Sequence, residues 1–447
     1  MQLIAGKVLE FYNKLVPQHK LVVIFFVYMF IGLVLLSLPC CQKTSVGFID
    51  NLFTSASAVS TTGLVTVPTG TSYSFLGQLV ILLLIQLSGV GYMTMSSFLF
   101  LHGHSDVPRE TQAIMKAEFS VPKDFNLSLF LHSVIYFTLF VEAFGALFLF
   151  LAFYFNGGGF FASLWSGIFH AISAFCTAGF TLYPESLSGF LNAPFVTEIT
   201  SILSLLGAFG FIPVTELVEN MMGESKPLSY TSRSIFFSFA VLILFGSVML
   251  ILFEPSLKNN DFTSRVYGAV AQSINAMSTS GYNNVNLANT SFTALCVLML
   301  LMFIGGAPAG TSGGIKTTTA FLLGAVLVGR ITGRNTVRLD GKDIPLKKIY
   351  LAASTLIFYM VVLYFIVLLL TISEKAPFHQ IIFDSLAALS TGGISSGLAE
   401  KMTAFGKLVL IAAMFIGRIG VITFGLSFFV QNEQKPAEPA KKVDIAL

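Results

Sequence analysis

The chain has 447 residues, of which 55% are hydrophobic and 11% are charged, and its mean hydropathy is +0.82. These values exclude a soluble domain and predict a protein that crosses a membrane several times. The net charge of +3, with its lysines and arginines scattered over short loops, excludes a basic surface for nucleic acid. Four cysteines are too few for a disulfide framework, so we expect unpaired thiols.

The first apolar run, residues 21–38, follows a basic start and could therefore belong to a signal peptide. It is long for such a peptide, and the residues after it, Pro39 and Cys40, do not form a small-residue cleavage site. We therefore expect a retained first transmembrane helix.

Eight long apolar segments follow one another in pairs, each near or above the roughly 20 residues that a bilayer core requires. We expect the leading helix of each pair at 21–38, 127–155, 233–253 and 349–371. The trailing helices are expected at 75–101, 196–221, 292–328 with an interruption, and 406–429.

A seven-residue motif lies between the two helices of every pair: Ala, any residue, Ser or Cys, Thr, any residue, Gly, and an apolar residue. Its copies are 58–64, 174–180, 276–282 and 388–394, with glycines about 100 to 120 residues apart. A lone copy would also fit a glycine-capped helix end, but repetition at this period predicts one structural unit used four times. Each copy is interpreted as a re-entrant loop, because irregular backbone at membrane depth must be buried in protein or line a cavity.

The segments before the motifs, 50–57, 164–173, 266–275 and 380–387, have the length of helices that cross half a bilayer. Their C-terminal ends would converge with about half a negative charge each, which favours a cation. Glycine lets carbonyl groups turn inward, and a ring of carbonyls can replace the hydration shell of an ion. The motif threonine could hold the strand against its helix or face the ion. The absence of Asp and Glu from the motifs argues against a divalent pore.

Two spans in each unit return the chain to its starting side, so the units are expected to be parallel repeats. The expected fold is all-α integral membrane, with four tandem helix, pore-loop, helix repeats around a pseudo-four-fold axis. Its expected parts are 1–101, 102–223, 224–330, 331–430 and a tail, 431–447. Most lysines and arginines lie on one side, so the positive-inside rule predicts both termini in the cytoplasm.

The third trailing helix contains a run of small residues and proline, 305–316, that cannot stay helical. We expect an intramembrane loop there, with these candidate gate residues: Gly305, Gly306, Gly310, Gly313 and Lys316. Arg418 is the sixth candidate, 25 residues after Gly393, just as Gly306 follows Gly281 by 25. An arginine in the bilayer is costly, so Arg418 should face the pore or tie down the broken helix. Lys316 could serve the gate or extend to the cytoplasmic interface.

Residues 310–314 match the nucleophile-elbow pattern, but a membrane helix precedes them instead of a strand, so no catalytic residue or enzyme activity is predicted. His102 and His104 are too few ligands to predict a metal site. We expect hydrogen bonds within the second repeat to satisfy His170 and Glu142, with ion coupling as the alternative.

Four tandem units with one motif glycine each resemble the membrane subunit of the Ktr, Trk and HKT superfamily of cation transporters, over essentially the whole chain. The length and short tails are most similar to the bacterial Ktr type. The resemblance implies a potassium selectivity filter at the motifs, with the loop and Arg418 as a barrier below it. The filter residues implied are Ser60, Thr61, Thr62, Gly63, Cys176, Thr177, Ala178, Gly179, Ser278, Thr279, Ser280, Gly281, Ser390, Thr391, Gly392 and Gly393.

Some plant members of this superfamily carry serine at the first filter glycine and transport sodium, so Gly63 implies a preference for potassium. The resemblance also implies a homodimer in the bacterial plasma membrane, docked on a cytoplasmic ring of nucleotide-binding regulatory subunits, with sodium promoting uptake. No cofactor is expected in this chain; potassium is the substrate, and nucleotide is expected only on the partner. The competing interpretations are a coupled secondary transporter of another cation or solute and, depending on Ser312, a membrane-embedded hydrolase.

Overall fold

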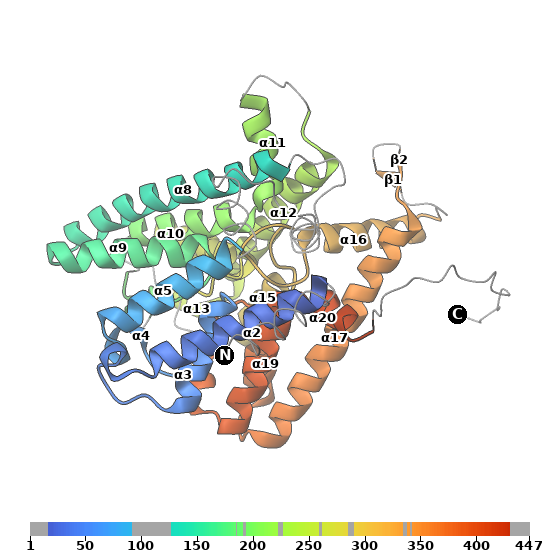
Figure 1. The fold of residues 1–447 in the computed structure, drawn as a ribbon. Coiled ribbons are helices and arrows are strands. Elements are labelled where there is room, and N and C mark those ends of the chain that lie inside the picture. The colour runs from blue at the N-terminus through green and yellow to red at the C-terminus, as the bar shows by residue number, and fades with distance from the viewer. Residues whose placement is uncertain are drawn as a thin grey trace.

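The computed structural model describes residues 17–91, 127–184, 186–190, 194–221, 227–258, 262–284, 290–333, 338–339 and 342–429, most of them helical (Figure 1). The predictions for the first residues, for the loop containing His102 and His104, and for the tail 431–447 lie outside these ranges. Beside the helices, two short antiparallel strands, β1 (Arg338–Leu339) and β2 (Lys342–Asp343), form a hairpin near the ends of α16 and α17.

Four leading helices carry the apolar sequence outward to the surface. They are α2 (Pro17–Leu36), α8 (Leu127–Phe155), α12 (Tyr230–Phe253) and α17 (Leu346–Ser373). Large side chains such as Phe140, Leu244 and Phe365 are exposed on them, which suits contact with hydrocarbon. Among the described residues, three helices are long and apolar enough to cross a bilayer, and a bent pair would make a fourth: Phe130–Phe155, Tyr230–Phe253, Leu346–Ser373, and Pro194–Ala208 with Phe211–Met221.

The trailing helices are more interrupted than predicted. The first is α5 (Phe75–Gly89) within the described residues, and the others are α10 (Pro194–Ala208) with α11 (Phe211–Met221), α15 (Phe292–Phe303) with α16 (Thr317–Ile331), and α19 (Ala404–Ile419) with α20 (Val421–Phe429). The prediction of unbroken helices over 196–221 and 406–429 is wrong. Gly210 and Gly420 have φ of +79° and +91°, which lies outside helical geometry. At Gly210 the angle between α10 and α11 is 87°.

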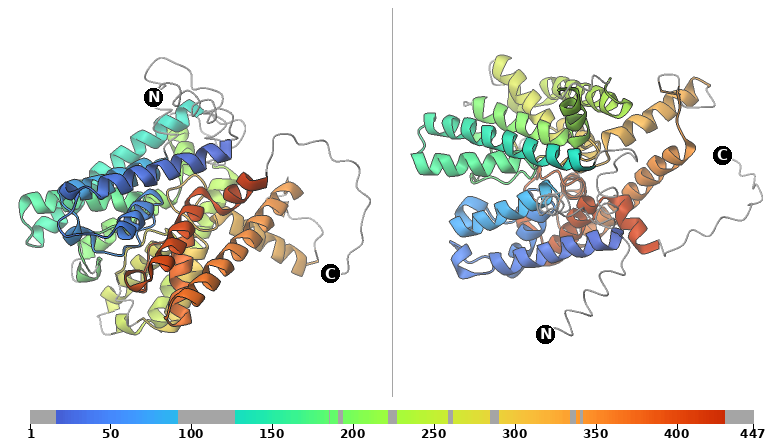
Figure 2. Two further views of the ribbon diagram at one scale, coloured as in Figure 1. Left: turned by 60° about the horizontal axis from the view of Figure 1, so that its bottom comes forward. Right: turned by 45° about the horizontal axis from the view of Figure 1, so that its top comes forward.

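Four shorter helices occupy the predicted half-spanning segments: α3 (Phe48–Val59), α9 (Phe160–Phe175), α14 (Phe262–Met277) and α18 (Phe378–Leu389). Each packs between the leading and trailing helices of its own repeat. Each also touches the preceding trailing helix: α5 on α9, α10 on α14, α15 on α18, and α19 on α3. The last contact joins the fourth repeat to the first and closes a cycle. Figure 2 shows α8 beside α9 and, across the molecule, α17 beside α19.

The short connecting elements are α4 (Thr69–Ser72), α13 (Pro255–Lys258) and the 3-10 turns Pro39–Cys41, Ser188–Phe190 and Ala399–Lys401. The buried core gathers around the C-terminal ends of the short helices, where Phe175, Phe180 and Tyr282 have no exposed surface. The four motifs therefore lie at the centre of the molecule.

Candidate ion pathway

Each of the four short helices ends in a turn of the same conformation. The motif threonine has a left-handed backbone each time: φ is 50°, 51°, 53° and 50° at Thr61, Thr177, Thr279 and Thr391. This conformation is rare for a β-branched residue. Its N–H donates to the carbonyl of the motif alanine at 3.0 to 3.1 Å, and the next N–H donates one residue further back at 2.7 to 3.0 Å. Left-handed residues of this kind cost about 1–3 kcal/mol each and occur mainly at functional sites.

The motif glycines bring the four turns into a closed ring. A Cβ on Gly63 would collide with the carbonyl oxygen of Ala178, and one on Gly179 would collide with that of Ser280. The third glycine, Gly281, would place a Cβ 3.0 Å from Cα of Gly393. A Cβ on Gly393 would in turn collide with the carbonyl oxygen of Thr62 in the first motif. Only glycine permits these approaches, and the order of contacts returns to its start.

The predicted filter residues are all in these turns, and all are buried. They are Ser60, Thr61, Thr62, Gly63, Cys176, Thr177, Ala178, Gly179, Ser278, Thr279, Ser280, Gly281, Ser390, Thr391, Gly392 and Gly393. The negative ends of four helix dipoles meet there, while the motifs contain no acidic residue. This electrostatic environment suits a monovalent cation.

Three of the motif threonine hydroxyls lie against the intramembrane loop, residues 304–316. In the second motif, the Thr177 hydroxyl donates to Thr311 Oγ1 at 3.2 Å. In the third, the backbone N–H of Gly313 donates to Thr279 Oγ1 at 2.9 Å. Gly313 also abuts the fourth motif, since a Cβ there would collide with Thr391 Oγ1. Three of the four hydroxyls therefore lie against the loop, an arrangement that was not predicted from the sequence.

Backbone hydrogen bonds hold the loop in the interior of the protein. It leaves α15 after Phe303 and enters α16 at Thr317, so it spans the predicted gate residues Gly305, Gly306, Gly310, Gly313 and Lys316. The N–H groups of Ala307 and Thr311 donate to carbonyls in the second trailing helix, at 2.9 and 3.2 Å. In return the N–H of Phe211, just after the bend, donates to the Ala309 carbonyl at 2.9 Å. The break in that helix is thus filled by the loop.

Arg418 ties the loop to the first motif. Its Nη1 donates to Thr61 Oγ1 at 3.0 Å and to the Thr311 carbonyl at 2.7 Å, and its Nη2 donates to the Ser88 carbonyl. One guanidinium from the fourth repeat thus holds groups of the first and third. Lys316 stays within the loop, donating from Nζ to the Ser312 carbonyl at 2.5 Å.

Thr311 was not predicted as a site residue, yet it joins more of the site than any glycine of the loop. Besides its bonds to Thr177 and Arg418, its hydroxyl donates to the Phe175 carbonyl at 3.1 Å. The available signal was a threonine in a stretch, residues 305–314, otherwise made of Gly, Ala, Pro and Ser. Such a residue can bond the motif threonines hydroxyl to hydroxyl.

Several polar links behind the ring join repeats that are distant in sequence. Glu142 accepts from Gln86 of the first repeat at 2.9 Å and from the Cys176 thiol at 3.8 Å, so it is not satisfied by the second repeat alone. His170 does bond within its own repeat. Asp50 and Lys407, from the first and fourth repeats, form an ion pair of 2.6 Å.

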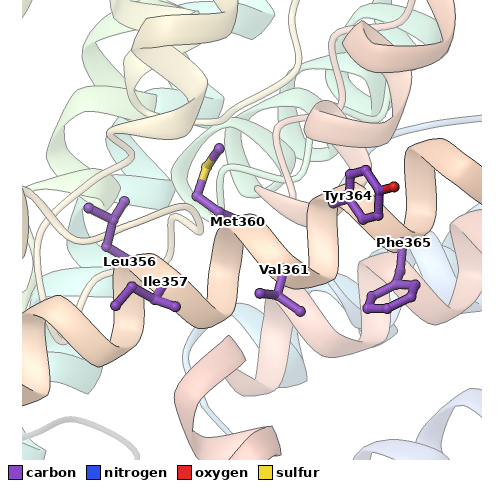
Figure 3. A pocket seen from close by; sticks show the side chains of 6 residues that line it. All are labelled: Leu356, Ile357, Met360, Val361, Tyr364 and Phe365. Carbon is purple, nitrogen blue, oxygen red and sulfur yellow. The ribbon is translucent and has the colours of Figure 1, made fainter.

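Other features of the described residues do not suggest a second site. All four cysteines are free, as predicted, and no group of three His, Cys, Asp or Glu among the described residues is placed to hold a metal ion. A surface recess on α17 is lined by Leu356, Ile357, Met360, Val361, Tyr364 and Phe365 (Figure 3). Apolar and aromatic side chains dominate this lining, so it faces lipid more suitably than an ion.

Comparison with known proteins shows the family to which the chain belongs. Residues 16–438 match the family described as "TrkH: Cation transport protein". The chain belongs to the TrkH family of cation transport proteins. The resemblance seen in the motifs is therefore confirmed, and membership identifies a membrane transporter.

Individual proteins are similar over most of the chain. The Ktr system potassium uptake protein B of Bacillus subtilis (strain 168) is 30% identical over 422 residues, covering 93% of both chains. The potassium/sodium uptake protein NtpJ of Enterococcus hirae is 29% identical over 435 residues, covering 95% of both. The crystal structure of the potassium transporter TrkH from Vibrio parahaemolyticus matches with a TM-score of 0.71 at 19% identity, over 91% of this chain and 83% of that one. This last likeness establishes the shared fold.

Proposed function

We propose that this TrkH-family chain takes up potassium through the ring of four motifs, in a bacterial plasma membrane with both termini in the cytoplasm. The observation that carries the proposal is the closed ring, in which every motif glycine lies against the backbone of the next motif. Relatives named as potassium uptake proteins support the choice of ion. The repeats act as four pore loops, each formed by a short helix and its motif.

Potassium enters from outside and exchanges its water for carbonyl oxygens of the filter residues. The converging helix ends stabilise the ion without a carboxylate in the motifs, and this favours a monovalent over a divalent cation. The membrane potential supplies about 2.3 kcal/mol per charge per 100 mV, enough for roughly a fifty-fold gradient. Hydrolysis of nucleotide within this chain is not part of the mechanism.

The loop and Arg418 form the gate. The loop hydrogen-bonds the motif threonines Thr177 and Thr279, and Arg418 bonds both Thr61 and Thr311, so an ion leaving the ring must displace this assembly. We propose that a homodimer docks on a cytoplasmic ring of nucleotide-binding regulatory subunits that moves the loop. Relatives that are named as members of a Ktr system support partner subunits of this kind.

Substitution of Gly63 by Ser tests the filter. A side chain there must enter a backbone with φ of +88° and collides with the Ala178 carbonyl, so the first repeat can no longer present its carbonyls as the others do. We expect sodium flux to rise relative to potassium in proteoliposomes, and potassium-dependent growth of an uptake-deficient bacterium to weaken. An ion preference equal to that of the unchanged protein would refute the filter assignment.

The second candidate is transport coupled to sodium, favoured by the relative named as a potassium/sodium uptake protein. With the membrane potential clamped at zero, an imposed sodium gradient should drive potassium uptake only if the two fluxes are coupled. Sodium that merely promotes uptake will instead raise the rate without moving potassium against its own gradient.

A further inference from the structure

A buried polar side chain stands nine residues before the glycine of every motif. These residues are Thr54, His170, Gln272 and Asp384, with exposed fractions of 1%, 0%, 1% and 0%. They lie inside the four short helices. Burying a polar group there is unfavourable unless it is hydrogen-bonded, so the repetition points to a shared partner.

In three repeats that partner is the backbone N–H twelve residues further on, the third residue after the glycine. The N–H of Leu182 donates to His170 Nε2 at 3.4 Å. The N–H of Asn284 donates to Gln272 Oε1 at 2.9 Å, and the N–H of Ser396 donates to Asp384 Oδ1 at 2.8 Å. The first repeat differs, because Thr54 accepts from the Tyr73 hydroxyl at 3.1 Å.

Hydroxyl groups reinforce two of these contacts. Thr181 lies 3.1 Å from His170 Nε2, and Ser395 donates to Asp384 Oδ2 at 3.2 Å. Each of these two side chains therefore holds two consecutive residues after the glycine, Thr181 and Leu182 in the second repeat and Ser395 and Ser396 in the fourth. Movement of these residues would turn the carbonyls on both sides of the glycine.

We propose that His170, Gln272 and Asp384 are positioning residues that hold the outward segment of their motifs and so maintain ion selectivity, and that His170 makes the second motif sensitive to acid. This rests on the proposed potassium pathway. The three residues act through the backbone and do not touch the ion.

The hydrogen bonds of His170 determine which tautomer of the imidazole can accept from the Leu182 N–H. Its Nδ1 lies 2.7 Å from the Ser166 carbonyl, which can only accept, so Nδ1 carries the proton. Nε2 of the neutral ring is then the acceptor that Leu182 requires. A second proton on Nε2 would set two donors against each other and release the segment.

The other groups around His170 do not titrate in the same range. Tyr183 stacks on the ring at 5.3 Å, and Tyr282 lies 6.4 Å from it with its hydroxyl 3.5 Å from the His170 carbonyl. Both phenols ordinarily stay neutral well above pH 8. Phe153 and Phe169 cover the remaining sides of the ring. Asp384 is the other titratable positioning residue, so acid sensitivity is assigned from the difference between the wild type and a His170 variant.

The experiment compares His170→Gln with His170→Phe in proteoliposomes, with potassium and sodium fluxes measured from neutral pH down to about pH 4, because a fully buried imidazole resists a second proton. Glutamine is the residue that the third repeat uses at this position, and it keeps an acceptor. We expect His170→Gln to retain selectivity and to lose part of the acid-dependent decline. His170→Phe keeps an aromatic ring without an acceptor, and its potassium preference should fall about two- to tenfold, as for one lost hydrogen bond.

The reciprocal variant, Gln272→His, places an imidazole at the equivalent position of the third repeat and should steepen the acid-dependent decline. If the wild type carries no potassium, the proposed function fails. If the wild type is selective while all three variants match its selectivity and pH profile, the positioning proposal alone is overturned. Should His170→Phe not fold, the pH profiles of His170→Gln and Gln272→His still decide the question.

Discussion

Gly313 has no room for a side chain because it lies against the fourth motif. Its N–H holds Thr279, and a Cβ would collide with both the Ser390 carbonyl and Thr391 Oγ1. One residue of the loop therefore contacts the third and the fourth motif at once. A methyl group at this position acts as a wedge between the loop and the ring.

We expect Gly313→Ala to raise ion flux. Overpacking of this kind destabilises the closed position of the loop by about 1–3 kcal/mol. The equilibrium between the released and the closed loop then shifts at least roughly five-fold toward release. Flux in proteoliposomes measures the effect. Gly324→Ala in α16 is the matched control, because a Cβ there meets open space. Unchanged flux in Gly313→Ala would remove the loop from the gate.

The broken helices show how an element depends on its neighbours. At Gly210 the chain turns out of the helix, and the N–H of the next residue is taken by the Ala309 carbonyl. At Gly420 the turn is made within the fourth repeat, and the nearest atom to a Cβ would be Thr423 Oγ1 at 3.7 Å. The two glycines share a backbone conformation but differ in crowding.

Gly420→Ala should lower the free energy of unfolding by about 1–2 kcal/mol, the ordinary cost of a left-handed residue with a side chain. Gly210→Ala should cost about 1–3 kcal/mol more, because its Cβ also collides with the Pro308 carbonyl of the loop. Unfolding midpoints in detergent measure both variants. Equal losses would show that the loop is not packed into the bend.

Local pattern predicted the short helices and the motif turns because the same residues recur at the same offsets. It did not predict the bends at Gly210 and Gly420, since a single glycine costs an apolar helix only about 1 kcal/mol and the sequence does not reveal the carbonyl that replaces the lost bond. The bonds from the motif threonines to the loop were missed for the same reason. They depend on how three repeats meet, and spacing within one repeat carries no such information.

At the scale of the whole molecule, the cycle closes where α19 meets α3. The ion pair of Asp50 and Lys407 stands at this junction, with side chains 22% and 14% exposed. The pair is neither fully exposed nor fully buried, so removing one partner should cost roughly 1–3 kcal/mol, more than at the surface and less than in a sealed core. It therefore contributes to holding the first repeat against the fourth.

Asp50→Asn and Lys407→Gln should each lower the unfolding midpoint, and the exchange of the two residues, Asp50→Lys with Lys407→Asp, should restore part of it. Arg338 and Asp343 provide the control, since their pair has side chains 63% and 59% exposed and its removal should cost less than about 1 kcal/mol. The double variant Asp50→Asn with Lys407→Gln completes the cycle. If its loss of stability equals the sum of the two single losses, Asp50 and Lys407 are not directly coupled.

The junction also orders events during biosynthesis. Asp50 is made early, yet its partner follows 357 residues later, and Arg418, which holds Thr61, is separated from it by the same distance. At about 5–20 residues per second, the first repeat waits roughly 20–70 s in the membrane before α19 is translated. During that interval one side of α3 has no protein neighbour from the fourth repeat. Ribosome-bound chains shorter than this should therefore expose α3 to lipids or to insertion factors, and an intact ring becomes possible only at the end of translation.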